Sequence, residues 1–315
     1  MDAWRVVFQQ PPALDPATAH PIGLSLPHLC LATSGLLLAE LLLQTLGQAI
    51  ARLIGLPRRT VTKFAHAFTD LCYYTYSVLR LMDLLWSATW AWPGGWHELM
   101  FDGRVQQVPE LAPYTAPADL QRFHLMETSF YLSSFFLLLV RPRKKDFAQM
   151  ALHHIVTASL LMLSYHTGYL RIGAVVMYLH NIFDPFLLLA KCAHYAKLPV
   201  LPDVSFALCA VAFAVPRLGF YPRVIHYAWR GVCTGTPTCP GGVWDKTPVE
   251  FALVGLLVAL LPIHVVWFAM ILKVLWKAWS SKGVQGDVRS DSEDDGDAEL
   301  AEEVSQLRHR QQKTL

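Results

Sequence analysis

Charged residues are scarce in this chain. Of its 315 residues, 16% are charged and 54% are hydrophobic, and its mean hydropathy is +0.34. That composition excludes an ordinary soluble domain and favours a protein that crosses a membrane several times. The formal net charge of +2 says little by itself, and we expect no nucleic-acid partner.

Several motifs are also missing. The sequence contains no internal repeat, no glycine-rich phosphate loop and no cysteine spacing typical of a metal site. Asn181 is the only asparagine and is followed by Ile182-Phe183, which excludes N-glycosylation at the standard acceptor motif. Residues 1–28 lack the basic start and adjoining apolar core of a cleavable signal peptide. We therefore expect one membrane domain without a second globular module.

Long apolar stretches predict seven membrane-spanning helices. Each is near the roughly 20 residues that cross a bilayer core. They lie at 29–51, 65–92, 122–140, 147–165, 170–190, 203–221 and 249–276. The predicted fold is an all-α membrane protein with three parts: a short lumenal segment (1–28), a transmembrane domain (29–280) and a disordered acidic cytosolic tail (281–315).

Basic residues predict the orientation of these spans. Half of them lie in the connections after the first, third and fifth spans and beside the last: Arg52, Arg58, Arg59, Lys63, Arg141, Arg143, Lys144, Lys145, Lys191, Lys197, Lys273, Lys277 and Lys282. By the positive-inside rule these connections face the cytosol, so the N-terminus is expected in the lumen and the C-terminus in the cytosol. The connection between the last two spans dilutes this contrast, because it holds Arg217, Arg223, Arg230 and Lys246.

Two features outside the predicted spans suggest covalent modification. Cys233 and Cys239 lie in a predicted lumenal connection, where an oxidising compartment permits a disulfide. Two free thiols fit the same spacing. In the tail, Ser290 and Ser292 each precede an acidic residue, which is typical of sites for acid-directed kinases. A plain solubilising tail is the alternative.

Ionisable side chains occur inside two consecutive predicted spans. The fourth span contains His153 and His154, and the fifth contains His180 and Asp184. At the helical rise per residue, the histidine pair lies about 12 Å, Asp184 about 10 Å and His180 about 16 Å from the cytosolic end. Such groups are costly inside a membrane and are typical of functional sites. We therefore expect one buried reaction centre, nearer the cytosol than the lumen.

Helix geometry predicts roles within this cluster. His180 and Asp184 share a helix face, so the carboxylate is expected to fix the imidazole tautomer and to raise its basicity. The adjacent His153 and His154 point about 100° apart, so we expect one to face the pocket while the other packs or orients it. Thr157 lies one turn beyond His153, within reach of a hydrogen bond to it.

Three other interpretations of the cluster stay open. Histidines in membranes often make interhelical hydrogen bonds that only serve packing. Three histidines and a carboxylate also suit a zinc site, although the adjacent pair diverges and no H-x-x-x-H spacing is present. A proton relay in a transporter is the third, although no repeated half suggests alternating access. We expect no metal.

The central part of the chain resembles the longevity-assurance motif of the ceramide synthases, which are TLC-domain membrane proteins. The motif comprises Leu152-His153-His154-Ile155-Val156-Thr157, Ser164-Tyr165, Arg171-Ile172-Gly173, His180, Asp184, Ala190-Lys191 and Tyr195. Residues 127–131, 143–147, 217–218, 221–222 and the acidic stretch 287–291 are also similar to that family. The resemblance covers roughly 125–198 and the tail, and it is weak before residue 60.

The resemblance implies a reaction and its partners. Ceramide synthases transfer an acyl chain from fatty acyl-CoA to the amine of a sphingoid base such as sphinganine, in the endoplasmic reticulum membrane and without a metal or other cofactor. By this resemblance, His153 or His154 is the nucleophile or base, while His180 and Asp184 orient it and manage the amine proton. Substrate contacts are expected from Arg143, Lys144, Lys145, Lys191 and Arg217.

Two questions about partners and activity stay open. Besides the two substrates and membrane lipids, a homodimer is compatible with the sequence. The alternative to an enzyme is a non-catalytic TLC-domain protein that binds lipid or assists membrane-protein handling. The enzyme requires His153, His154 and Asp184, whereas a binding protein should tolerate a conservative change such as His154→Gln.

The chain departs from the family pattern within the motif. Asn181 stands where the family has an aspartate after the histidine, Phe183 replaces a serine and Leu188 replaces a glutamate. Asparagine forms hydrogen bonds but cannot ionise or take up a proton. If the aspartate is needed as a charge, the chemistry here is impaired or altered. If it only orients a histidine, Asn181 suffices, and we expect it to orient the site together with Thr157.

Overall fold

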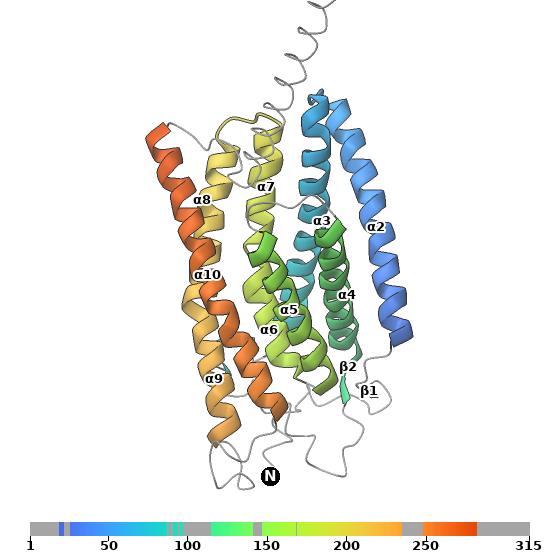
Figure 1. Ribbon diagram of the computed structural model, residues 1–315, viewed down its shortest axis with the longest axis vertical. Coiled ribbons are helices and arrows are strands. Elements are labelled where there is room, and N and C mark those ends of the chain that lie inside the picture. Colours follow the sequence, from blue (N-terminus) through green and yellow to red (C-terminus); the bar gives the residue numbers. More distant parts are fainter. Residues whose placement is uncertain are drawn as a thin grey trace, which may run out of the picture.

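The computed structural model describes residues 19–21, 26–86, 88, 91–93, 95–96, 115–140, 147–167, 169–234 and 248–281. These residues form an antiparallel bundle of helices (Figure 1), which confirms the predicted all-α membrane fold. The helices are α2 (Leu26–Leu53), α3 (Arg58–Trp86), α4 (Ala118–Val140), α5 (Phe147–Thr167), α6 (Leu170–Asn181), α7 (Asp184–Tyr195), α8 (Leu201–Phe213), the π-helix η5 (Ala214–Phe220), α9 (Tyr221–Thr234) and α10 (Pro248–Ser281). One short antiparallel pair, β1 (Ala19–Pro21) with β2 (Thr115–Pro117), was not predicted.

Six segments in the described part of the chain are long and apolar enough to cross a membrane. They are Pro27–Leu53, Ala118–Val140, Phe147–His166, Leu170–Tyr195, Leu201–Trp229 and Phe251–Ala278. Helix α3 is as long as these and packs between α2 and α7 in the same direction as the bundle axis (Figure 1). Counted with α3, about seven passes result, as expected for a multi-pass membrane protein.

Two passes are interrupted near the middle of the bundle. The fifth pass breaks at Ile182 and Phe183, and α7 restarts with Asp184-Pro185, because proline is tolerated in the first turn of a helix but not in its interior. The sixth pass winds into η5 around Pro216, whose missing N–H disrupts the α-helical hydrogen bonding. Both irregular stretches lie beside the buried ionisable residues.

The sixth pass is longer than predicted. It continues as one helical run through η5 and α9 to Trp229, instead of ending near residue 221. Arg223, which lies beyond the predicted span, is therefore in α9, and Arg217, which lies within it, is inside the bundle at 4% exposure. The basic residues that diluted the orientation signal thus belong partly to the span itself.

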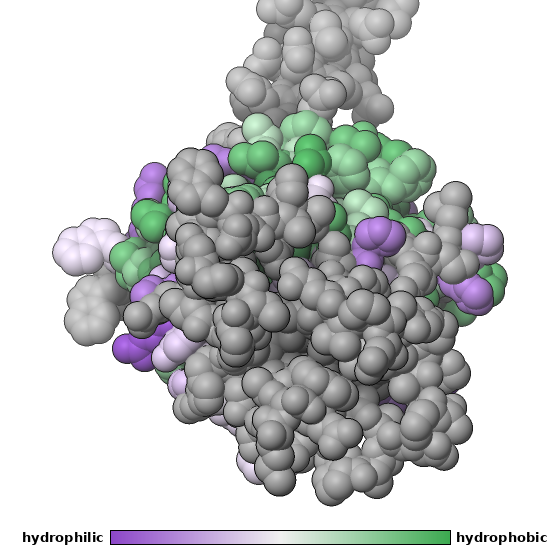
Figure 2. Space-filling model, turned by 90° about the horizontal axis from the view of Figure 1, so that it is seen from below, coloured by the Kyte–Doolittle hydropathy of each residue, from purple (hydrophilic) through white to green (hydrophobic). Residues whose placement is uncertain are grey.

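The two ends and the sides of the bundle differ in polarity. The α2–α3 connection, the end of α7 and the end of α10 lie together at the top of Figure 1 and carry basic residues: Arg52, Arg58, Arg59, Lys63, Lys191, Lys197, Lys273 and Lys277. We call this the basic end. The view from the opposite end shows apolar side chains gathered along one margin (Figure 2). Large apolar side chains are exposed on α2, as a lipid-facing helix requires: Leu31, Leu38, Leu41, Leu42 and Leu46. The assignment of the basic end to the cytosol stays a prediction.

Several predicted features lie outside the described residues. They are residues 1–18, the cations Arg143, Lys144 and Lys145, the side chains of Cys233 and Cys239, and the tail with Ser290 and Ser292. The proposed disulfide, the phosphorylation sites and the division into three parts stay predictions.

Candidate active site

A large cavity opens toward the basic end, and we call it the polar cavity. Its volume is about 1430 Å³, counted with its open mouth. Lys191 and Lys273 line its outer part, and the buried His153 and His154 line its wall. Helices α5, α7, α8, η5 and α10 contribute most of its other side chains, including Asp184, Phe213, Arg217 and Trp267. The structure thus brings five of the predicted site residues around one space that is reached past a basic rim: His153, His154, Asp184, Lys191 and Arg217.

Both histidines of the adjacent pair line the polar cavity. Each is 7% exposed, and their ring centroids are 5.8 Å apart. The expectation that only one would face the pocket is wrong. The polar cavity is wide enough to contact both side chains, although they project from α5 about 100° apart. Trp267 of α10 packs edge-on against His153, with ring centroids 4.9 Å apart.

The Nδ1 atoms of His153 and His154 have no hydrogen-bond partner within the described residues. The Thr157 hydroxyl, also buried, has none either, so the expected bond between Thr157 and His153 is not formed. Buried polar atoms in native proteins are nearly always paired, so unpaired ones need an explanation. Three such atoms beside cavities are consistent with a site that binds a polar group of a ligand.

His180 pairs with a histidine that sequence reasoning did not select. Its Nδ1 lies 2.7 Å from the Val176 carbonyl oxygen, which can only accept, so Nδ1 carries the proton. Its Nε2 lies 3.0 Å from Nε2 of His264 in α10. Since the neutral His180 ring then has Nε2 free to accept, His264 donates its Nε2–H. The expected carboxylate partner, Asp184, is replaced by His264, because the break after Asn181 turns α7 away from the face of α6.

Arg217 connects the two interrupted passes. Its Nη2 donates to the His180 carbonyl oxygen at 2.6 Å and lies 3.8 Å from the Asp184 carboxylate. The guanidinium lies over the rings of Phe183 and Phe213, 4.0 and 4.7 Å from their centroids. Its Nε and Nη1 have no hydrogen-bond partner among the described residues. Arg217 was predicted as a substrate contact, and its position in the wall of the polar cavity leaves two donors for one.

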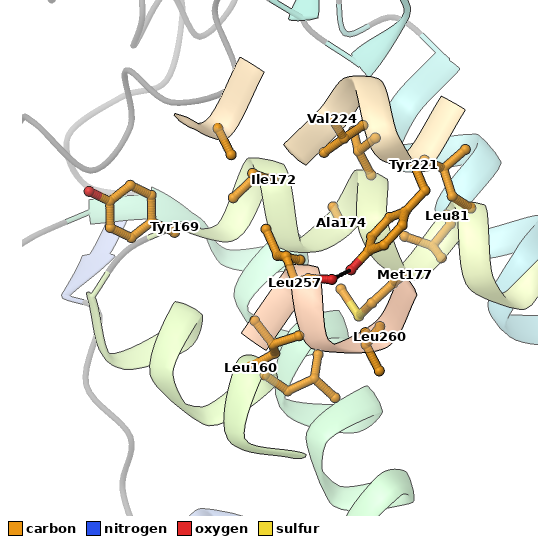
Figure 3. Close-up of a cluster of buried hydrophobic side chains, with 14 of the residues drawn as sticks. Leu81, Leu160, Tyr169, Ile172, Ala174, Met177, Tyr221, Val224, Leu257 and Leu260 are labelled. Carbon is orange, nitrogen blue, oxygen red and sulfur yellow. Dashed lines mark hydrogen bonds between the residues drawn. The ribbon is translucent and has the colours of Figure 1, made fainter. Parts of the chain in front are cut away.

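A second cavity lies farther from the basic end, and we call it the apolar cavity. Its volume is about 690 Å³, counted with its openings to solvent. Its walls come from α5, α6, α9 and α10, and Figure 3 shows several of the side chains involved: Leu160, Ile172, Met177, Leu257 and Leu260. Beside it, the fully buried Tyr221 donates its hydroxyl to the Leu257 carbonyl oxygen at 2.7 Å (Figure 3). His180 lines this cavity, and Tyr131 lines both cavities.

Asn181 does not orient a histidine directly. Its side chain points from α6 toward α3 and α4, where it bonds to Ser77, Glu127 and Tyr131. Its link to the histidine pair runs through Tyr131, whose ring centroid is 6.4 Å from that of His153 and 6.0 Å from that of His154.

Comparison with known proteins identifies the family. The TLC-domain model matches residues 63–273, which include every helix from most of α3 to most of α10. This chain belongs to the TLC-domain family. Human ceramide synthase 5 is 30% identical over 247 residues, which are 76% of this chain and 57% of that protein. Ceramide synthase LOH2 of Arabidopsis thaliana is 30% identical over 76% of this chain and 78% of its own length. The Alternaria stem canker resistance protein 1 of tomato is 35% identical over 53% of this chain.

These similarities place this TLC-domain protein among the ceramide synthases, as the motif indicated. The chain spans little more than half the length of several relatives: 57% of human ceramide synthase 5, 59% of mouse ceramide synthase 4 and 55% of the tomato protein.

Among the described residues, no three side chains of histidine, cysteine, aspartate or glutamate are grouped closely enough to hold a metal ion. The absence of a metal in the reaction therefore stays a prediction.

Sequence reasoning missed His264, although a signal was available. His264 is a lone histidine in the middle of the most apolar span, Phe251–Ala278, and it is fully buried. An ionisable residue inside a membrane span is a functional hypothesis by default. The motif on α5 and α6 contains no residue of α10, and no spacing rule links positions 84 residues apart.

Proposed function

We propose that this protein is an acyl-CoA-dependent N-acyltransferase of sphingoid bases in the endoplasmic reticulum membrane, acting without a metal or other cofactor. The relatives named ceramide synthase support the reaction class. Fatty acyl-CoA is the acyl donor and a long-chain base such as sphinganine is the acceptor. The location is inferred from the family, and the multi-pass fold is compatible with it.

One observation carries this proposal: a polar cavity with a histidine wall is followed by an apolar cavity on the far side of Tyr131. Coenzyme A is anionic and must stay in water, whereas its acyl chain gains free energy on leaving water. Lys191 and Lys273 at the outer part of the polar cavity suit the phosphates. The apolar cavity suits a hydrocarbon chain. A thioester joining the two parts would then lie beside His153 and His154.

The histidine pair supports two routes for acyl transfer. In the covalent route, a ring nitrogen attacks the thioester carbonyl carbon, the C–S bond breaks, and the departing thiolate takes up the imidazole proton. The amine then attacks the acyl-imidazole carbonyl, the bond between carbon and imidazole nitrogen breaks, and an amine proton returns to the imidazole. In the direct route, the amine attacks the thioester while a histidine takes its proton and passes it to the thiolate.

The pair of His180 and His264, together with Arg217, assists these steps. The Val176 carbonyl fixes the tautomer of His180, and the Nε2–H of His264 helps to hold the ring in one orientation beside the apolar cavity. The two unpaired donors of Arg217 can stabilise negative charge that develops on the carbonyl oxygen. Asp184 limits the net charge by pairing with Arg217. These roles replace the expected pair of His180 and Asp184.

The deciding experiment measures acyl transfer from fatty acyl-CoA to sphinganine by purified protein in detergent, with lipid mass spectrometry as readout. We expect N-acyl sphinganine from the wild type and a loss of roughly 10²–10⁴-fold for His153→Ala or His154→Ala. His166→Ala is the matched control, because His166 lies on the same helix but is exposed. An added acyl mass on a peptide that contains His153 and His154 would support the covalent route.

The other interpretations predict different results. Absence of product with several amines and chain lengths would contradict the proposal and leave the lipid-binding interpretation. Full activity of His154→Gln would contradict a catalytic role for that residue. Flux of protons across vesicles without product formation would favour the transporter.

A further inference from the structure

Polar side chains of α3, α4 and α6 form a buried hydrogen-bond network around Glu127 and Asn181. Glu127 and Asn181 are both 0% exposed. Glu127 accepts hydrogen bonds from the Tyr73 hydroxyl at 2.9 Å, the Ser77 hydroxyl at 2.7 Å and the Asn181 amide at 3.0 Å. All three donors are neutral, so one buried carboxylate is held by hydrogen bonds alone.

The hydrogen bonds of this network run toward Glu127, either directly or through Ser77 and Asn181. The Asn181 amide has two hydrogens, one directed to Glu127 Oε2 and the other to Ser77 Oγ at 2.9 Å. Ser77 can therefore pass its own hydrogen to Glu127 Oε1. The remaining Asn181 oxygen accepts from the Tyr131 hydroxyl at 3.3 Å. Asn181 thus uses both hydrogens and its oxygen, which an aspartate at this position could not do.

An aspartate here would place a second carboxylate about 3.0 Å from Glu127, the distance that the amide nitrogen now occupies. Two carboxylates that close cannot both ionise without a large cost. Ser77 would also lose the group that donates to it. Asn181, which departs from the ceramide synthase pattern, can donate to the Glu127 carboxylate, whereas an ionised aspartate could not.

We propose that Asn181 is a positioning residue matched to Glu127: it keeps the network at one carboxylate and thereby holds the Tyr131 hydroxyl at the junction of the two cavities. Tyr131 lines both cavities, and its ring faces His153 and His154. Its hydroxyl hydrogen is committed to Asn181 and its oxygen accepts from the Tyr74 hydroxyl, which leaves one lone pair to accept from a donor such as the substrate amine. The kinetic part of this proposal rests on the proposed acyl transfer.

The test is an exchange of charge between the two positions. Purified Asn181→Asp, Glu127→Gln and the double variant are compared with the wild type in acyl transfer and in thermal unfolding in detergent. We expect Asn181→Asp to lower kcat by roughly tenfold or more, with the KM for acyl-CoA nearly unchanged because the basic rim is untouched. The double variant restores kcat to within a few-fold, because the amide introduced at position 127 can donate to the carboxylate introduced at position 181. A general structural defect would not be repaired by a second substitution.

Two further results decide the proposal. Asn181→Asp as active as the wild type, or a double variant as impaired as Asn181→Asp, would overturn the carboxylate conflict. Tyr131→Phe keeps the bonds to Glu127 and should lower kcat with the KM for acyl-CoA nearly unchanged; wild-type kinetics in that variant would overturn the positioning of Tyr131. If the wild type makes no product, the proposed function fails, yet the midpoints still decide the conflict: Asn181→Asp should lower the midpoint and Glu127→Gln should restore it.

Discussion

The polar and apolar cavities are built by the same passes but differ in chemistry. The polar cavity takes its walls from α7, α8 and η5, which form the half of the bundle at the basic end (Figure 1). The apolar cavity takes its walls from α6 and α9, which continue the same passes in the other half. Helices α5 and α10 contribute to both. The break at Ile182-Phe183 and the π-helix η5 separate the two halves.

The difference teaches where irregular backbone is needed in this fold. Helix α5 lines both cavities without an interruption, because residues at different levels of one helix can differ in polarity. In the fifth and sixth passes, the break between α6 and α7 and the wider turns of η5 change which face continues toward the basic end. They direct Asp184 and Arg217 into the polar cavity, whereas Ile172 and Met177 face the apolar one.

The largest expected effect comes from breaking the buried charge pair between the two halves. Arg217→Gln should lower the free energy of unfolding by about 3 kcal/mol, because it leaves the Asp184 carboxylate without its arginine partner. Reversible unfolding in mixed detergent micelles measures this change. Arg223→Gln, an exposed position in α9, is the matched control and should stay within about 0.5 kcal/mol of the wild type. Equal effects at both positions would mean that the arginine pair does not hold the halves together.

The next-largest effect concerns the hydrogen bond between His180 and His264, beside the apolar cavity. His264→Ala should lower acyl transfer by roughly 10–100-fold, because it removes the donor that holds the His180 ring in place at Nε2. His264→Gln keeps a donor near the same place and should recover part of the loss. The rates of product formation measure both, with exposed His226→Ala as the control. If the Gln and Ala variants are equally slow, the hydrogen bond to His180 is not the cause.

A smaller effect is expected when the apolar cavity alone is changed. Ile172→Phe adds volume to the wall, so the longest acyl chains that the wild type accepts should be transferred roughly tenfold less well relative to shorter ones. The KM for a short acyl-CoA should not change, because the rim is untouched. Competition between acyl-CoA chain lengths measures the ratio. Ile155→Phe on the exposed face of α5 is the matched control, and a similar shift there would contradict the assignment of the cavity to the acyl chain.

The sequence predicted the bundle and half of the site for clear physical reasons. The length of an apolar helix that crosses a membrane must match the thickness of the bilayer core, so the seven passes follow from composition and length. His153, His154 and Asp184 could be found because ionisable residues are conspicuous in such spans. Their convergence on one cavity followed from matching depths on antiparallel neighbours, which the structure confirms.

The remainder of the site depends on contacts between distant passes. The pairing of His180 with His264 needs the rotation of α6 against α10, and the bonds of Asn181 need its direction toward α3 and α4. Neither direction can be read from one helix, because the break after Asn181 changes which face continues. The i, i+4 relation of His180 and Asp184 failed for the same reason: a spacing rule holds only within an uninterrupted helix.

The smallest expected effect concerns the rim of the polar cavity. Lys191→Ala combined with Lys273→Ala should raise the KM for acyl-CoA a few-fold and leave kcat unchanged, because charges in contact with water contribute about 1 kcal/mol or less each. The effect should shrink as ionic strength rises, since salt screens such charges. Steady-state kinetics at two salt concentrations measure both trends. Lys277→Ala is the matched control, because Lys277 is exposed on the same helix but lies outside the cavity wall. A salt-independent change, or an equal change in the control, would show that the rim lysines serve topology rather than recognition of coenzyme A. The difference between the polar and apolar cavities would then rest on their inner walls alone.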